Sequence, residues 1–230
     1  ICTIGTNSTV SDLWNHTELN SILPNLRKHL KLVSSEQIRN MASLGGNLVN
    51  ASPIGDMTIF FLALNSEITI TNENQKERTI ALKNFYQGYK KFDLKEGELL
   101  KDIRFKLPNK NTFFNFEKVC KRTHLDIASV NSAIHLSIEN EIISEAHVSL
   151  GGVAAIPKYL HDTSTILTGK PLTSETILEA NEILQKEISP ISDVRGTTDY
   201  KRLLARQLFF AHFTELFPNN FTLNDFVQHA

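Results

Sequence analysis

Two alternating runs with a short connection between them place the strongest constraint on how this chain folds. Apolar and polar side chains alternate from Val130 to Ile138 and again from Ile142 to Leu150, with Glu139-Asn140-Glu141 between the runs. A period of two is typical of strands that bury one face, and so short a connection joins antiparallel neighbours. The sequence therefore predicts a long antiparallel hairpin, which Gly151-Gly152 breaks or bulges.

Further strands are expected ahead of this hairpin. Residues 67–71 and 78–82 flank a turn at 72–76, and residues 98–107 and 112–120 have an extended pattern. Because neighbouring runs with short connections pair antiparallel, these segments predict an antiparallel sheet.

Helical spacing dominates both ends of the chain. Near the start, Thr9 or Ser11 can cap a first turn, and Pro24 begins a new helix. After Pro157, helices are expected over 163–167, 175–187 and 199–217, the last one capped by Thr197 or Thr198. The fold class is thus α+β: an antiparallel sheet with helices, followed by a C-terminal antiparallel hairpin or sheet with three helices. The chain divides near residues 108 to 120.

Composition excludes several classes of protein. The 230 residues are 41% hydrophobic, and 24 Lys and Arg stand against 25 Asp and Glu, so the chain lacks the basic excess of a nucleic-acid binder. The longest apolar run, Met57 to Leu64, is too short to span a membrane. Cys2 and Cys120 lie far apart without a CxxC pair, which argues against a disulfide framework or a four-cysteine cluster site and favours the reducing cytoplasm. The histidines show no zinc-site spacing.

One segment stands out chemically. Residues 34–56 lose helical periodicity and fill with Ser, Asn, Gly and Pro, which predicts a long ordered loop. Its centre is Ser43-Leu44-Gly45-Gly46-Asn47, with Asn50 and Ser52 close behind. Two interpretations stay open: the paired glycines let successive N–H groups turn inward toward an anion, or they make a plain turn before a buried helix that Asp56 caps.

Several stretches, in order along the chain, resemble the flavin-binding components of the molybdenum hydroxylases. The fullest match runs from Gln37 to Leu48 and from Ala51 to Asp56, which is similar to the second FAD-binding loop of that family. Further matches are Ile4-Gly5 with Thr9 to Leu13, Lys118 with Arg122 and Asp126-Ile127-Ala128, Gly151 to Ala154, and Asp193 to Gly196 with Tyr200 and Arg202. The family includes flavin subunits or domains of xanthine dehydrogenase, aldehyde oxidase and carbon monoxide dehydrogenase. Together the matches cover about residues 1 to 217.

The resemblance implies a domain plan and a set of cofactor contacts. Residues 1–110 would be the C-terminal part of a PCMH-type FAD-binding domain, residues 111–218 a domain like the C-terminal one of carbon monoxide dehydrogenase flavoproteins, and 219–230 a tail. The implied FAD-binding residues are Val33, Ser43, Leu44, Gly45, Gly46, Asn47, Asn50, Ser52, Asp56, Leu100 and Lys118.

Individual roles follow from the same resemblance. Val33 would pack beside the isoalloxazine ring, and the backbone of Leu100 would meet it. Asp56 would contact the sugar or adenine side of FAD, whereas Lys118 would lie near the pyrimidine end, where a positive charge favours the reduced anionic flavin. The residues alone favour the interpretation of Lys118 and Arg122 as solvated charges on an exposed strand. Asp193 and Arg195 are expected to form a local ion pair at a helix entry, without a chemical role.

The resemblance also implies a function. Electrons would pass from [2Fe-2S] clusters through the flavin to NAD or another acceptor, while a molybdopterin component hydroxylates the substrate. The iron-sulfur and molybdopterin-binding partners would be other chains or domains. The loop from Cys120 to Leu125, with Lys121, Arg122 and His124, would control access of the acceptor.

One departure from the family leaves alternatives open. The family's glycine-rich first flavin loop has no counterpart in these 230 residues, and the opening Ile1 favours a fragment of a longer polypeptide. A truncated, flavin-free scaffold subunit and a stand-alone PCMH-type flavin oxidase are therefore both retained as alternatives.

Overall fold

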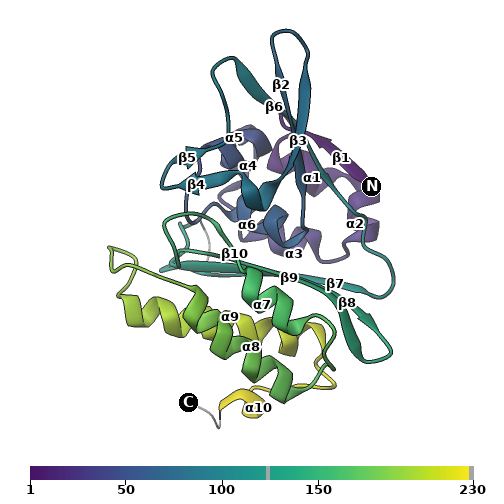
Figure 1. Cartoon of the computed structure of the whole chain (residues 1–230), viewed down its shortest axis with the longest axis vertical. Coiled ribbons are helices and arrows are strands. Elements are labelled where there is room, and N and C mark those ends of the chain that lie inside the picture. Colours follow the sequence, from purple (N-terminus) through teal and green to yellow (C-terminus); the bar gives the residue numbers. More distant parts are fainter. Residues whose placement is uncertain (123–124, 228–230) are drawn as a thin grey trace.

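Two four-stranded antiparallel sheets, a small two-stranded sheet of β4 and β5, and the covering helices make up the computed structural model, which describes residues 1–122 and 125–227. The first sheet has the strand order β1-β6-β2-β3 and the second the order β10-β9-β8-β7 (Figure 1). The strands are β1 (Cys2–Gly5), β2 (Glu67–Asn72), β3 (Glu77–Ala81), β4 (Tyr86–Gly88), β5 (Lys91–Phe92), β6 (Glu98–Phe105), β7 (Thr112–Val119), β8 (Val130–Glu139), β9 (Ile142–Gly151) and β10 (Lys158–Tyr159). The expected α+β class is confirmed.

The helices fall into two groups. The first group belongs to the upper part of Figure 1 and comprises α1 (Val10–Asn15), α2 (Thr17–Ile22), α3 (Leu26–Lys31), α4 (Glu36–Met41), α5 (Leu44–Val49) and α6 (Asp56–Ala63), with a 3-10 turn η1 (Leu82–Asn84). The second group lies beneath the second sheet and comprises α7 (His161–Leu167), α8 (Ser174–Glu187), α9 (Thr198–Leu216) and α10 (Asn224–Val227).

Helix α6 explains how the two parts of the chain pack together. Its residues from Met57 to Ala63 are all buried, because it lies between the first part and the second sheet, where it contacts β8 and β9. The Ser149 hydroxyl on β9 donates a hydrogen bond to the Ile59 carbonyl at 2.7 Å. The second sheet is therefore covered on both faces, by α6 and α3 above and by α7 and α9 below. Each part retains its own apolar core.

The long hairpin is confirmed, with His135 opposite His147 and one register shift after Ser137. The strands expected over 98–107 and 112–120 also exist, but they lie in different sheets, β6 in the first and β7 in the second. The alternation of polar and apolar residues cannot reveal this switch, since it specifies which face is buried and not which sheet a strand joins.

Two local expectations are wrong. The segment 34–56 is not a continuous loop, because α4 and α5 lie within it, each only six residues long and capped by Ser35 and Ser43. Asp56 does not cap α6: Gly55 is the N-cap, and the Asp56 side chain turns away to partners on β7 and β8. Helices this short carry too little periodicity to stand out from a polar loop.

The predicted cap of the last long helix is confirmed, since the Thr197 hydroxyl accepts a hydrogen bond from the Tyr200 N–H. Beyond that helix, Phe221 and Phe226 are buried against the lower core, within the segment expected to be a tail. Among the described residues, no helix has the length and apolar character that a membrane span requires.

Candidate cofactor-binding site

The segment around α5 is held by its own backbone hydrogen bonds. The Leu44 N–H donates to the Ser8 carbonyl at 2.9 Å and the Gly45 N–H to the Thr6 carbonyl at 2.8 Å. The Gly46 N–H donates to the Ser43 hydroxyl oxygen at 3.1 Å, as expected of an N-cap. These N–H groups therefore do not converge on an anion, so of the two interpretations left open for the paired glycines the inward-turned N–H groups are not found.

The two glycines of this segment serve different purposes. A Cβ atom on Gly45 would lie 2.7 Å from the Thr6 Cβ, so this glycine allows α5 to pack closely on the end of β1. Gly46 is exposed, and a Cβ atom there would come near only the Ser43 hydroxyl, at 2.9 Å. Gly46 thus leaves an open surface over which a ligand can approach the backbone.

The polar side chains of this segment are uncharged. The Asn47 Oδ1 accepts hydrogen bonds from the Thr58 N–H and hydroxyl, at 3.1 and 3.2 Å, which leaves the amide NH₂ available. Asn50 is exposed, and the Lys90 ammonium donates to its carbonyl and side-chain oxygens. Ser52 accepts a hydrogen bond from the Ile54 N–H. The segment therefore presents hydroxyl and amide groups beside the Gly46 surface.

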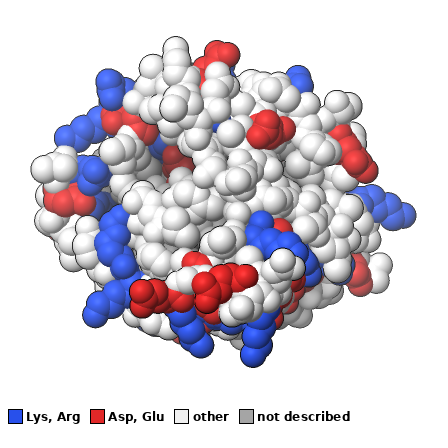
Figure 2. Space-filling model, turned by 90° about the horizontal axis from the view of Figure 1, so that it is seen from above, with Lys and Arg blue, Asp and Glu red and all other residues white. Residues whose placement is uncertain are grey.

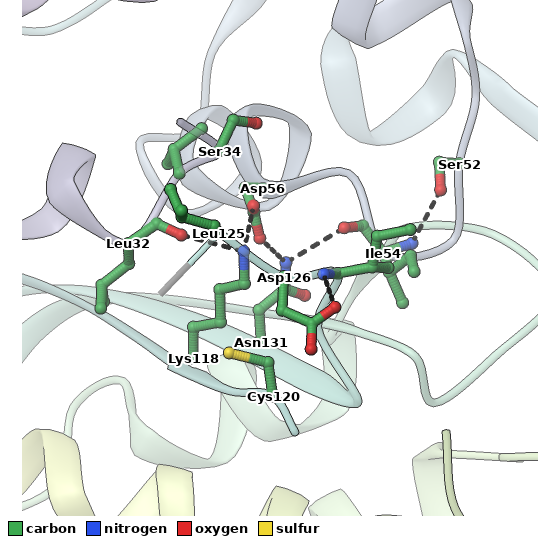
Figure 3. A network of polar contacts seen from close by, with 12 residues as sticks. Leu32, Ser34, Ser52, Ile54, Asp56, Lys118, Cys120, Leu125, Asp126 and Asn131 are labelled. Atoms are coloured by element: carbon green, nitrogen blue, oxygen red, sulfur yellow. Dashed lines mark hydrogen bonds and ion pairs between the residues drawn. The ribbon is translucent and has the colours of Figure 1, made fainter. Parts of the chain in front are cut away.

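A buried ion pair lies at the start of α6, next to this segment (Figure 3). The Lys118 ammonium on β7 donates to Asp56 Oδ2 at 2.7 Å and to the Leu32 carbonyl at 2.9 Å, and its side chain is only 2% exposed. The Asn131 amide on β8 donates to Asp56 Oδ1 at 2.6 Å and to the Ile54 carbonyl at 3.3 Å. The interpretation of Lys118 as a solvated surface charge is therefore wrong.

The electrostatics of this pair follow from its burial. Burial raises the pKa of the Asp56 carboxyl above its ordinary value, whereas the Lys118 ammonium and the Asn131 amide act in the opposite direction. An ion pair excluded from water needs such additional hydrogen bonds to offset its desolvation. Lys118, Asp56 and Asn131 therefore stabilise one another, although Asp56 is far in sequence from Lys118 and Asn131, which are cross-strand neighbours on β7 and β8.

Glycines of the C-terminal part make this contact sterically feasible. Gly151 faces Asn131 across β8 and β9, and a Cβ atom there would lie 2.1 Å from the Asn131 Oδ1. The next residue, Gly152, has a φ of +83° and donates its N–H to the Pro53 carbonyl at 2.9 Å. The C-terminal part thus holds the Pro53–Asp56 turn through backbone contacts that a side chain would prevent.

The remaining predicted residues lie around this centre. Val33 is buried, and its carbonyl accepts a hydrogen bond from Arg39 at 2.8 Å. Leu100 is buried on β6, and its carbonyl accepts a hydrogen bond from the Thr6 hydroxyl at 2.6 Å. Because Thr6 also accepts the Gly45 N–H, Leu100 is connected to the α5 segment through Thr6 and not directly.

The structure thus joins the predicted residues into one neighbourhood and adds two that the sequence reasoning missed, Thr6 and Asn131. A polar residue directly after the first strand, and an asparagine opposite the Gly-Gly pair of the hairpin, were the available signals. The exposed Arg122 forms an ion pair with Asp126 at 3.3 Å. His124 lies outside the described residues.

Comparison with known proteins shows which family has domains of this kind. A family model described as the FAD binding domain in molybdopterin dehydrogenase matches residues 2–109, and one described as the CO dehydrogenase flavoprotein C-terminal domain matches residues 116–216. Xanthine dehydrogenase from Oryza sativa is 32% identical over 191 residues, which are 81% of this chain and 14% of that protein. The carbon monoxide dehydrogenase medium chain from Afipia carboxidovorans is 29% identical, over 88% of this chain and 69% of that one.

Solved structures agree with the sequence matches. A carbon monoxide dehydrogenase from Hydrogenophaga pseudoflava that lacks the Mo-pyranopterin moiety of its cofactor aligns with a TM-score of 0.84 and 26% identity, covering 90% of this chain and 71% of that chain. The protein is thus of the flavin-binding class defined by these domains. The chain belongs to the family of FAD-binding components of the molybdenum hydroxylases, as the sequence motifs predicted.

The residues present fit the FAD that this family binds. Gly46 leaves the loop surface open where a side chain would otherwise project, and Ser43, Asn47 and Asn50 supply uncharged polar groups around it. The buried Lys118 ammonium, which is bound to Asp56 at the start of α6, lies next to this segment. Within residues 1–122 and 125–227, no three His, Cys, Asp or Glu side chains are grouped so as to hold a metal ion.

Proposed function

We propose that this chain is the FAD-binding, electron-transferring component of a cytoplasmic oxidoreductase related to xanthine dehydrogenase. In this proposal, [2Fe-2S] clusters and molybdopterin are carried by partner chains or domains, and NAD or another acceptor takes the electrons. The chain spans only 14 to 15% of the plant xanthine dehydrogenases it matches, so the remaining machinery has to come from elsewhere. Bound FAD would supply the ability to exchange one or two electrons at a time.

The observation that carries the proposal is that the open surface at Gly46 lies beside the buried charge of Lys118. Gly46 and its uncharged neighbours offer a cradle for a large ligand, and the Lys118 ammonium is fixed beside it by Asp56 and by the Leu32 carbonyl. Such a group stabilises charge without reorganising, because its position is already determined before the ligand binds.

The contact between Asp56 and Lys118 refines their roles. Because the Lys118 ammonium and the Asp56 carboxylate are 2.7 Å apart, we propose that both lie nearest the pyrimidine end of the flavin instead of at opposite ends of FAD. The Asp56 carboxylate also offsets the charge of Lys118, so the pair favours a reduced anionic flavin less than a lone ammonium would. Val33 and the backbone near Leu100 are proposed to flank the ring.

The domain plan is part of the same proposal. Residues 1–110 would bind FAD, residues 111–218 would supply Lys118 and the Asn131 contact, and residues 219–230 would be a tail, of which Phe221 and Phe226 pack against the lower core. Acceptor choice would depend on the loop that follows β7. Reoxidation of the reduced holoenzyme by NAD and by oxygen, compared under the same conditions, tests whether NAD is the acceptor.

The decisive experiment is the flavin content of the full-length gene product, measured by visible absorbance and by identifying the released nucleotide. Near-stoichiometric FAD is expected, with loss of FAD on replacing Gly46 or Asp56. An intact fold without flavin would contradict the proposal and favour a scaffold. A flavin that an organic substrate reduces in the isolated chain would instead favour a stand-alone oxidase.

A further inference from the structure

A groove lies between α8 and α9, at the end of the molecule where α10 is found (Figure 1). Its volume is about 390 Å³. Phe226 on α10 lines one side, where its ring stacks on that of Phe210 with a centroid distance of 4.7 Å. Together with Leu178 these rings form an apolar floor. The groove therefore lies on the side of the second sheet away from the candidate cofactor site.

Acidic side chains dominate the rim of this groove. Glu175, Glu179 and Glu182 follow one another at helical spacing along α8, and Arg206 on α9 is the only basic side chain that the described residues place in the lining. Glu179 pairs with Lys170 at 2.5 Å, whereas the other two glutamates form no ion pair within the described part of the chain. By contrast, the face seen from above carries both signs around its margin (Figure 2). The groove therefore favours a ligand that carries positive charge along an apolar body.

Two buried polar atoms in the groove lack hydrogen-bond partners. Asn181 on α8 is only 5% exposed, and its Oδ1 accepts no hydrogen bond from the described residues. On the facing helix, the buried Nε of Arg206 likewise donates to no acceptor among them. Such atoms destabilise a fold, because they give up hydrogen bonds to water and receive none in return. The pair is therefore complementary to a ligand that supplies both a donor and an acceptor.

An extended peptide segment supplies both groups at close spacing. Its N–H can donate to Asn181 Oδ1 and its carbonyl can accept from Arg206 Nε, whereas a helix has already used these groups internally. Alternate side chains of an extended segment point to opposite sides. Basic residues can therefore reach the glutamates of α8 while apolar residues pack on the floor.

We propose that the groove between α8 and α9 binds an extended segment of a partner protein, in which Lys or Arg alternates with apolar residues. Asn181 and Arg206 hold the backbone of this segment, the glutamates of α8 pair with its cations, and the apolar floor receives its remaining side chains. The proposal does not depend on FAD, since the groove shares no residue with the candidate cofactor site.

The test uses the full chain and the fluorescence anisotropy of a labelled, end-capped peptide of alternating arginine and leucine. The wild type is expected to bind this peptide and not a peptide of alternating glutamate and leucine. Glu182→Gln should raise the dissociation constant about two- to five-fold, as expected for an exposed ion pair. The matched control is Glu73→Gln, which removes the same charge from the exposed β2–β3 turn and should leave the dissociation constant unchanged.

Asn181→Leu distinguishes a binding role from a structural one. Leucine has a similar volume but no polar atom. The dissociation constant should rise at least about five-fold, because the peptide N–H is then buried without an acceptor. The melting temperature of the unliganded chain should stay the same or rise, because the unpartnered oxygen is gone. A lower melting temperature would show that the Asn181 amide is satisfied in the free chain, and would overturn the proposal.

Other outcomes would also overturn it. A wild type that does not bind the arginine–leucine peptide would do so, as would unchanged binding in Asn181→Leu. Spermidine, which carries cations but no peptide group, should bind at least about five-fold more weakly than the peptide. Equal affinity would reduce the groove to an electrostatic surface. A dimer of the chain that the peptide dissociates would assign the groove to a second copy instead.

Discussion

The α5 segment and the Lys118 network form neighbouring parts of one candidate site, but the chain builds them differently. Ser43 to Asn50 are contiguous, small and partly exposed, and their backbone is fixed by local bonds and by Thr6 and Ser8. Lys118 and Asn131 are cross-strand neighbours on β7 and β8, whereas Asp56 lies 62 positions before Lys118 in the chain, so the three meet only when α6 packs on the second sheet. A contiguous segment leaves a readable motif, whereas a network from three elements does not.

The same difference predicts which substitutions lower the affinity for a ligand and which lower the free energy of unfolding. The exposed side chains of the α5 segment contribute little to the packed core, so changes there should affect mainly ligand affinity. The Lys118 network is buried and joins the two parts of the chain, so changes there should affect the fold first. The following experiments test that separation.

The largest effect is expected from Lys118→Met. It leaves the Asp56 carboxylate buried beside Asn131 without its cation, which should lower the free energy of unfolding by about 3–5 kcal/mol. Denaturant titration followed by far-UV circular dichroism measures the change. Adding Asp56→Asn to the variant removes the uncompensated charge and should restore much of the lost stability. If the double variant is as unstable as the single one, the pair does not act as a unit.

A second buried network, which contains two histidines, should make the stability of the fold depend on pH. His29 on α3 and His212 on α9 flank Asn115 on β7, with ring-nitrogen contacts of 3.1 and 3.0 Å, and His212 also contacts the Ser132 hydroxyl at 2.8 Å. Burial lowers the pKa of His29 to about 4 and that of His212 to about 3. Both pKa values are below the ordinary value of 6.5. As the pH falls, these histidines are therefore protonated at a higher pH in the unfolded chain than in the folded one.

Stability should therefore be fully present above pH 6.5 and decline as the pH falls toward 4, by up to about 1.4 kcal/mol per histidine per pH unit. Unfolding free energies between pH 6.5 and 5.5 measure this decline. Burial raises the pKa of Glu117 and Asp56, which gives an opposite contribution at lower pH. Burial also lowers the pKa of His135 to about 4 and that of His147, so these two histidines add to the slope. His212→Gln should therefore remove only the share of His212 from the slope in this window, and an unchanged slope would show that His212 titrates normally.

Much of the fold was predictable because its elements are long. The β8–β9 hairpin, α8 and α9 each carry enough periodic positions to be recognised, and Thr197 marks the start of α9 by its chemistry. The short α4 and α5 were not predictable, and the strand pattern alone did not assign β6 and β7 to different sheets, although the expected division of the chain near residues 108 to 120 lies between or at these strands. Six-residue helices show little periodicity, and sheet membership depends on contacts remote in sequence.

The residues of the candidate site also divide into those that the sequence could identify and those that required the structure. Ser43 to Asn47 were recognisable as a motif, although the motif did not show that the Leu44 and Gly45 N–H groups donate to Ser8 and Thr6. Lys118 was recognised by resemblance, but its burial and its contact with Asp56 required the packing of β7 against α6. The one signal for Asn131 was its place opposite the Gly-Gly pair of the predicted hairpin, and its cross-strand contacts with Gly151 and Lys118 became visible only in the structure.

Gly151→Ala tests that cross-strand contact. The added Cβ atom would lie 2.1 Å from the Asn131 Oδ1 and 2.9 Å from the Pro53 carbonyl, so Asn131 or the Pro53–Asp56 turn must shift. We expect a loss of about 1–3 kcal/mol in the free energy of unfolding, together with weaker FAD binding. Gly5→Ala is the control, since nothing lies within 4 Å of a Cβ atom there. Equal melting temperatures for the two variants would show that the hairpin tolerates the side chain.

The smallest effect on stability, and the sharpest test of the comparison, is expected from Gly46→Ala. Its Cβ atom would meet only the Ser43 hydroxyl, so the loss should not exceed that of a helix cap, about 1 kcal/mol. The dissociation constant for FAD, measured by flavin fluorescence, should nevertheless rise at least about ten-fold, because the methyl group occupies the surface on which the cofactor lies. Gly45→Ala provides the contrast: its Cβ atom would be 2.7 Å from the Thr6 Cβ, so it should destabilise the fold and weaken binding together. If Gly46→Ala binds FAD as tightly as the wild type, the α5 segment is only a turn between helices. The cofactor would then be held from the Lys118 side alone.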